Sequence, residues 1–288
     1  MHRFLACLSL LAAATAVAQP NVPAADRFRL ATQREIIALH QKMDQLRTST
    51  SPREKELQAA CSTNCTEVSA QLEAINTRKL AAMAGVASQI EHLVDVYISQ
   101  TVSPEITDAD CKRLAPELTQ ILGNDAVVNP PRVFAVALSS SRALVVFYAV
   151  SGGTAVNSYT VVRAFKSNGR MLVPSAVTGS DMNNYGDLSV LRLNAPLPDE
   201  LWLLIWGRVL GANGPNNGMR VYAYGARGFR TMWMSANIWA NVEVTPTSEG
   251  FRMDGTYYRQ EPELHQSYQV TLDGLYMTPV PAPSDRVK

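Results

Sequence analysis

The apolar side chains in the first part of the chain recur every three or four positions, which is the period of an α-helix. A first helix is predicted from about Ala24 to Arg47, with an apolar stripe of Ile36, Leu39, Met43 and Leu46. Ser49-Thr50-Ser51-Pro52 interrupts the pattern. A longer stripe follows, with Lys79 as its one charged position: Val68, Leu72, Ile75, Ala82, Val86, Ile90, Leu93 and Tyr97. The two stripes predict an antiparallel helical hairpin.

A third helix is predicted to begin at Thr107 and to end at Gly123-Asn124. Asp110, three residues after Thr107, makes a variant of the capping box that opens many helices. Pro116 lies in the middle of this helix and is expected to kink or shorten it. Its buried face is predicted to consist of Cys111, Leu114, Leu118 and Ile121.

From Val127 onward the chain changes to short runs rich in β-branched and aromatic residues, separated by turn signals such as Asn168-Gly169 and Asp273-Gly274. These runs predict twelve short antiparallel strands: Arg132–Ser139, Ala143–Val150, Ser158–Phe165, Arg170–Ala176, Leu188–Leu193, Leu201–Leu210, Met219–Tyr224, Phe229–Met234, Asn241–Thr245, Phe251–Tyr257, Ser267–Leu272 and Leu275–Thr278.

A weak internal repeat runs through these strands. Two three-strand units are offset by 58 residues, so that Leu144 corresponds to Trp202 and Val161 to Met219. A degraded third copy begins near Gly250. Repeated meanders are typical of propeller blades or of stacked sheets, but so few copies do not close a ring. The expected fold class is therefore α+β: a helical hairpin, then a β-meander domain of about 10–12 strands, either propeller-like or sandwich-like.

The first residues have the pattern of a cleavable secretory signal peptide. Arg3 precedes an apolar run too short to span a bilayer, and Ala16-Val17-Ala18 offers a cleavage site before Gln19. The expected division is a signal peptide at 1–18, a helical region at 19–126, a β domain at 127–278 and a disordered Pro-rich tail at 279–288. The mature protein is expected in the periplasm or outside the cell, with no later transmembrane segment.

Charge narrows the classes of partner. The chain has 26 Lys and Arg and 25 Asp and Glu. Cleavage of the signal peptide would remove one basic residue, Arg3, so the mature protein is neutral. With no cluster of Lys or Arg, it lacks the electrostatic surface that nucleic acids or anionic membranes require.

The cysteines predict one local disulfide. Cys61 and Cys65 lie between two helical segments, where a bond would join the helices at the bend. Cys111 lies on an apolar stripe and is interpreted as a buried thiol. A long-range bond from Cys111 to one of the other two is the alternative.

Two polar or aromatic clusters are candidate binding sites. Asp181, Asn183 and Asp187 half match a calcium loop, although Tyr185 stands at a ligand position and no closing Glu follows, so a plain polar loop is the alternative. An aromatic and amide-rich cluster could bind a sugar or a partner if exposed, or form sheet core if buried: Trp202, Trp206, Asn213, Asn216, Asn217, Trp233 and Trp239.

No catalytic motif or zinc-ligand spacing occurs, and the histidines of the two long helices have no partner motif. The expected function is therefore an exported, non-catalytic binding or scaffold protein without a cofactor, calcium excepted. A homodimer through the helical hairpin is a further expectation. The alternatives are a carbohydrate- or calcium-binding module, or an envelope glycan or peptide hydrolase. The hydrolase requires a carboxylate pair from a small set of acids: Asp181, Asp187, Glu243, Asp254 and Glu261.

Overall fold

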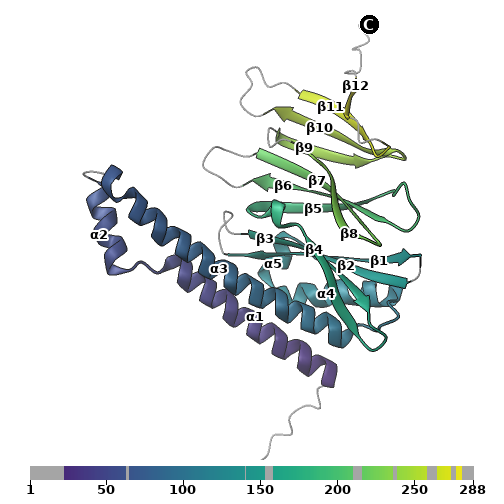
Figure 1. The fold of residues 1–288 in the computed structure, drawn as a ribbon, viewed down its shortest axis with the longest axis horizontal. Coiled ribbons are helices and arrows are strands. Elements are labelled where there is room, and N and C mark those ends of the chain that lie inside the picture. Colours follow the sequence, from purple (N-terminus) through teal and green to yellow (C-terminus); the bar gives the residue numbers. More distant parts are fainter. Residues whose placement is uncertain are drawn as a thin grey trace, which may run out of the picture.

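The computed structural model describes residues 23–62, 65–139, 141–152, 158–209, 216–235, 239–257, 265–273 and 277–280. Within these ranges, helices come first and antiparallel strands follow, which confirms the α+β class and the meander (Figure 1). The expected signal peptide lies outside the described residues. Among the described helices, none combines the length and hydrophobicity needed to cross a bilayer.

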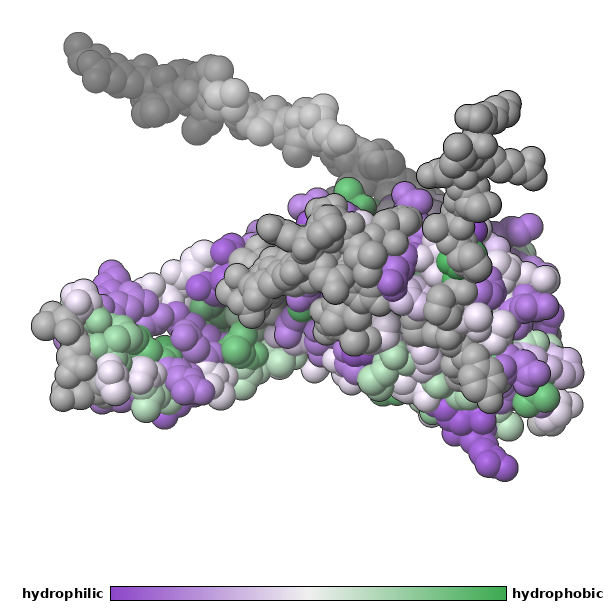
Figure 2. Space-filling model, turned by 90° about the horizontal axis from the view of Figure 1, so that it is seen from above, coloured by the Kyte–Doolittle hydropathy of each residue, from purple (hydrophilic) through white to green (hydrophobic). Residues whose placement is uncertain are grey.

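The predicted hairpin is present and has three parts: α1 (Ala24–Thr48), α2 (Pro52–Cys61) and α3 (Cys65–Thr101). Both α1 and α2 pack along α3, which is long enough to carry them in succession. This helical arm extends well beyond the sheets, with α2 at its far end (Figure 1). Seen from above, the arm again projects from the body, and hydrophilic and hydrophobic residues alternate over this face (Figure 2).

Lys79, the charged position in the long apolar stripe, pairs with α2 and the bend before it. Its Nζ lies 2.7 Å from Glu54 Oε2 and donates to the Ser49 carbonyl at 2.6 Å. Glu54 is only 5% exposed, so this pair neutralises a carboxylate buried between α2 and α3. Ser51 caps α2 by accepting from the Glu54 backbone N–H at 3.1 Å. A charge within an apolar stripe thus positions the bend of the arm.

The third helix, α4 (Asp108–Leu122), opens with the predicted capping box between Thr107 and Asp110. It runs through Pro116 to Leu122 rather than stopping early. Leu114 and Leu118 are fully buried, and this packing outweighs the backbone hydrogen bond that proline removes. A short helix that the sequence did not predict, α5 (Asn124–Val128), follows directly.

All twelve predicted strands are present, and they form three four-strand meanders. The strands of the first are β1 (Arg132–Leu138), β2 (Ser141–Ser151), β3 (Ser158–Ser167) and β4 (Leu172–Thr178). The 3-10 turn η2 (Ser180–Met182) leads to the second: β5 (Tyr185–Leu193), β6 (Leu201–Val209), β7 (Asn216–Gly225) and β8 (Gly228–Met234). The third comprises β9 (Trp239–Pro246), β10 (Gly250–Tyr257), β11 (His265–Thr271) and β12 (Met277–Val280).

The first meander is a separate sheet with the order β1-β2-β3-β4. The second and third share one sheet with the order β12-β11-β10-β9-β7-β6-β5, and β8 pairs with β7 outside this path. Within this larger sheet, the second meander joins the third where Asn217 of β7 pairs with Trp239 of β9.

The two clear copies of the repeat turn equivalent faces toward each other. Val145 of β2 and Leu203 of β6 share the core between the sheets. Their neighbours Leu144 and Trp202 lie on the opposite faces, in two other cores. Propeller blades are related by rotation about one axis, which would bring unlike faces together. Like faces that meet across a core form a sandwich, so the sandwich-like alternative describes these two sheets.

The helices and the outer face of the first sheet share one continuous core. It joins buried residues such as Ile90 of α3 and Leu118 of α4 with Val146 of β2. Ala126, at the expected border between the helical region and the β domain, belongs to this core as well. The helices therefore cover the first sheet as a layer.

The last strand extends slightly further than predicted. Within β12, Pro279 and Val280 pair with Tyr268 and Ser267 of β11, although both were expected in the disordered tail. Proline is tolerated because β12 is an edge strand, where a missing N–H breaks no ladder. Residues 281–288 lie outside the described part of the chain.

Candidate functional site

A cavity of about 730 Å³ lies where α1, the end of α4, α5 and the adjoining ends of β2, β3 and β5 meet. Its size falls within the range of small-molecule sites, roughly 300–1,000 Å³. Ile37 of α1 and Val128 of α5 are 48% and 55% exposed, so the cavity opens to solvent beside them. Its apolar wall is formed by Ile36, Ile37, Met43, Ile121, Leu122 and Val128.

His40 of α1 and Asp125 of α5 face each other in this cavity. His40 Nε2 lies 3.0 Å from Asp125 Oδ2, and the Asp125 side chain is 8% exposed. The contact lacks the alignment of a hydrogen bond, and neither atom has a hydrogen-bond partner among the described residues. A buried carboxylate oxygen without an aligned donor is costly, and a ligand with a donor would relieve that cost.

A β-bulge shapes the opposite wall. The pairing of β5 with β6 shifts register between Gly186 and Ser189, and Asp187 within the shift has a φ of 51°. Positive φ at a residue other than glycine is strained, and such bulges occur preferentially beside functional sites. Asn129, which follows α5, holds the bulge by accepting from the Leu188 backbone N–H at 2.7 Å.

Gly207 of β6 makes room for this bulge. A Cβ atom at this position would lie 2.8 Å from both the Gly186 carbonyl oxygen and Leu188 Cδ2. Ser158 of β3 fixes the start of β5 by donating to the Tyr185 carbonyl at 2.5 Å. The wall formed by β5 is therefore built by specific contacts from three other segments.

The three residues of the predicted calcium loop point to different partners. Asp181 accepts from the Tyr222 hydroxyl and lies 3.2 Å from Arg220 Nε. Asn183 Oδ1 accepts from the Thr160 backbone N–H at 2.8 Å. The Asp187 side chain is 65% exposed and lies 3.9 Å from Arg208. Burial, followed by the hydrogen bond to Asp181, raises the pKa of Tyr222.

Within the described residues, no three His, Cys, Asp or Glu side chains come together as a metal site requires. The calcium site stays a prediction, tested below by chelation.

The aromatic cluster is part of the sheet core rather than an open surface. Trp202 is 5% exposed and Trp239 2% exposed, and Trp206 and Trp233 pack partly buried against the same core. Trp233 and Trp239 make edge-on ring contacts with Phe251 and Tyr268 of the third meander. A sugar could not stack on Trp202 or Trp239 without opening this core.

One amide of that cluster joins two strands. Asn217 Nδ2 donates to the Trp239 and Ala240 carbonyls, and so joins β7 to β9. Asn216 is half-buried at the start of β7. Asn213 lies outside the described residues.

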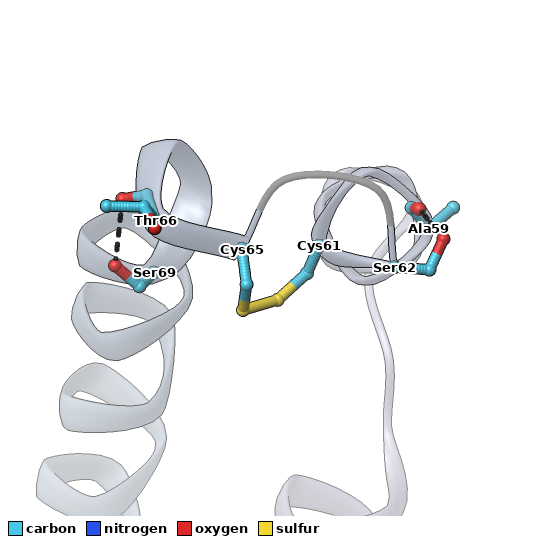
Figure 3. The surroundings of a disulfide bond; sticks show 6 residues. All are labelled: Ala59, Cys61, Ser62, Cys65, Thr66 and Ser69. Carbon is cyan, nitrogen blue, oxygen red and sulfur yellow. Dashed lines mark hydrogen bonds between the residues drawn. A yellow bond between two sulfur atoms is a disulfide. The ribbon is translucent and has the colours of Figure 1, made fainter.

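Cys61 and Cys65 form the predicted disulfide at the tip of the arm, between the end of α2 and the start of α3 (Figure 3). This bond excludes the long-range alternative for Cys111. Cys111 packs half-buried against the helix–sheet core, and burial, followed by the charges of Asp108 and Asp110, raises its thiol pKa. Because the thiolate is the reactive form, this setting favours an inert thiol.

A second buried charged group fastens α3 to the first sheet. Arg163 of β3 binds Asp95 and lies 2.7 Å from Glu91, and all three side chains are at most 20% exposed. Burial is the largest effect on both carboxyl groups and raises their pKa values, although Arg163 lowers them. Asp95 Oδ1, Arg163 Nε and the Tyr148 hydroxyl have no hydrogen-bond partner among the described residues.

Two of the acids proposed for a hydrolase lie opposite each other, but away from the cavity. Glu243 and Asp254 are cross-strand partners on β9 and β10, and Asp254 accepts from Arg252 and Ser267. Neither of them lines the cavity, whereas Asp187 does. Glu261 lies outside the described residues.

The sequence did not single out His40, Asp125 or Asn129, and His40 lies far along the chain from the other two. The available signal was Asp125 itself, an acid directly before the apolar run Ala126-Val127-Val128. No family model matches the chain, and neither a curated protein nor a solved structure shows a significant similarity to it.

Proposed function

We propose that this protein is an exported, non-catalytic binding protein whose small ligand occupies the cavity between the helices and the sheets. The observation that supports this is the pairing of an apolar wall with the buried, unaligned Asp125 carboxylate. Small-molecule sites usually combine such walls with a few convergent polar groups.

The construction of the cavity also supports binding. Residues from the helical layer and from both sheets line it, and the β5 bulge carries a strained residue to its edge. Strained backbone of this kind is found preferentially at ligand-binding and active sites. The export part of the proposal rests on the signal-peptide pattern and on the Cys61–Cys65 disulfide, which is typical of oxidising compartments.

The test is a thermal-shift screen of small molecules with the folded mature protein. A ligand at one hundred times its Kd stabilises by about 2.7 kcal/mol, which raises Tm by roughly 5–10 °C for a protein of this size. Ile37→Trp should fill the cavity mouth and abolish the shift. Leu30→Trp is the matched control, because Leu30 is an exposed apolar residue of α1 that does not line the cavity.

Shifts of equal size in the wild type and in Ile37→Trp would place the ligand elsewhere. A screen with no stabilising ligand would remove the proposal.

Dimerisation through the helical hairpin stays a separate proposal. The buried part of the long stripe, including Val86 and Ile90, packs within the chain, so a dimer would require another face of the arm. Light scattering at high protein concentration tests it, and a monomeric mass would exclude it.

A further inference from the structure

The geometry points to the chemical class of the ligand: an organic cation, with an ammonium group that binds Asp125 and an apolar body that lies on the helical wall. This inference rests on the proposed function, because it names what the same cavity takes.

The charges around the cavity favour a cation. Asp44, Asp125 and Asp187 line it, and among the described residues of its lining none is a lysine or an arginine. Two of the three acids already have a cation outside the cavity: Asp44 lies 3.1 Å from Arg47, and Asp187 lies 3.9 Å from Arg208. Both are more than half exposed. Asp125 is the buried acid of the three and faces only His40 among charged or titratable partners of the described chain.

An ammonium group would supply the hydrogen-bond donor that Asp125 Oδ2 lacks. Its donors rotate freely about the C–N bond, so one can align with the carboxylate where the His40 ring does not. An anionic ligand would face three carboxylates with no lysine or arginine among the described lining residues. A neutral ligand would leave the buried Asp125 carboxylate with only the unaligned His40 ring beside it.

The apolar body follows from the opposite wall. Ile37 and Val128 are 48% and 55% exposed and present apolar surface to a ligand. Ile36, Met43, Ile121 and Leu122 are at most 2% exposed and belong to the core of the helices and the first sheet, which supports this surface. A cavity of about 730 Å³ is too large for a bare ammonium ion and suits a ligand with several carbon atoms.

The experiment is calorimetric titration with three probes that differ only in their head group: 4-phenylbutylamine, 4-phenylbutan-1-ol and 4-phenylbutyrate. At neutral pH the first carries an ammonium and the last a carboxylate. The wild-type protein should bind the amine at least roughly tenfold more tightly than the alcohol, as expected for a hydrogen bond to a charged group, and the carboxylate most weakly. This order needs no variant.

Asp125→Asn keeps the shape of the side chain and removes its charge, and should abolish the preference for the amine. Glu35→Gln is the control: Glu35 is an exposed acid of α1 outside the cavity, and this variant should keep the wild-type order. An amine that binds no better than the alcohol, or a preference that survives in Asp125→Asn, would overturn the inference.

The two proposals fail in different ways. The thermal-shift screen could yield an uncharged or anionic ligand that Ile37→Trp no longer binds, while none of the three probes binds. In that case the inferred cationic class of the ligand is wrong and the binding function stands. If the screen also yields nothing, both fail.

Discussion

Removing the Arg163 guanidinium should destabilise the contact between the helical arm and the first sheet. Arg163→Met keeps much of the apolar length of the side chain but leaves Glu91 and Asp95 buried without their cation. Breaking a buried ion pair by removing one partner costs roughly 3–5 kcal/mol. For a protein of this size, such a loss lowers Tm by roughly 6–20 °C.

The loss should depend on pH in a defined direction. In the wild type, burial raises the pKa of Glu91 and of Asp95 even with Arg163 present. A carboxyl group whose pKa is raised on folding binds its proton more tightly in the native state. Its contribution to stability therefore falls as the pH rises from the unfolded value through the folded value. Without Arg163 the native pKa values rise further, so the damage should be greatest at neutral pH and smaller near pH 5.

The assay is urea denaturation of wild type, Arg163→Met and the triple variant R163M/E91Q/D95N at pH 7.5 and pH 5. The triple variant removes every charge of the cluster and should recover most of the lost stability, because uncharged replacements of buried ion clusters are often neutral. If the triple variant is as unstable as Arg163→Met at pH 7.5, or if the deficit of Arg163→Met does not shrink at pH 5, the electrostatic explanation is refuted.

Three further results are expected. Lys79→Met leaves Glu54 buried without its cation, so hydrogen exchange should accelerate in α2 more than in the sheets; unchanged exchange there would contradict the role of the pair. If Asp181 and Asn183 bind only protein groups, calcium or a chelator should leave Tm unchanged; a rise with calcium would support the metal loop. Mass spectrometry of the exported protein should find Gln19 as its first residue, and an intact leader would argue against cleavage.

Much of the fold was predictable because it follows from local patterns. The 3/4 spacing from Ile36 to Leu46 reports a helix buried on one face. The unbroken apolar run around Val145 reports a strand buried on both faces, and tertiary packing agrees with both patterns. The capping box at Thr107 is a contact between near neighbours in the chain. Pro116 does not shorten α4, because packing of α4 on the first sheet overrides the local preference of proline.

The candidate site was much less predictable, because it is formed by the meeting of distant segments. His40 looked like any polar residue beside an apolar stripe, and Asp125 lies in a helix too short to be recognised by periodicity. The aromatic cluster shows the reverse case. Trp202 and Trp239 were conspicuous in sequence, but conspicuous strand aromatics are buried when the second and third meanders of one sheet pack together.

Native mass spectrometry of the mature protein, released gently from the compartment to which we propose it is exported, would address the binding function without any assumption about the ligand. Wild type and Leu30→Trp should both carry a non-covalent small molecule, and Ile37→Trp should be free of it. A wild-type protein without a bound molecule, or one retained in Ile37→Trp, would contradict a ligand in the cavity beside Asp125.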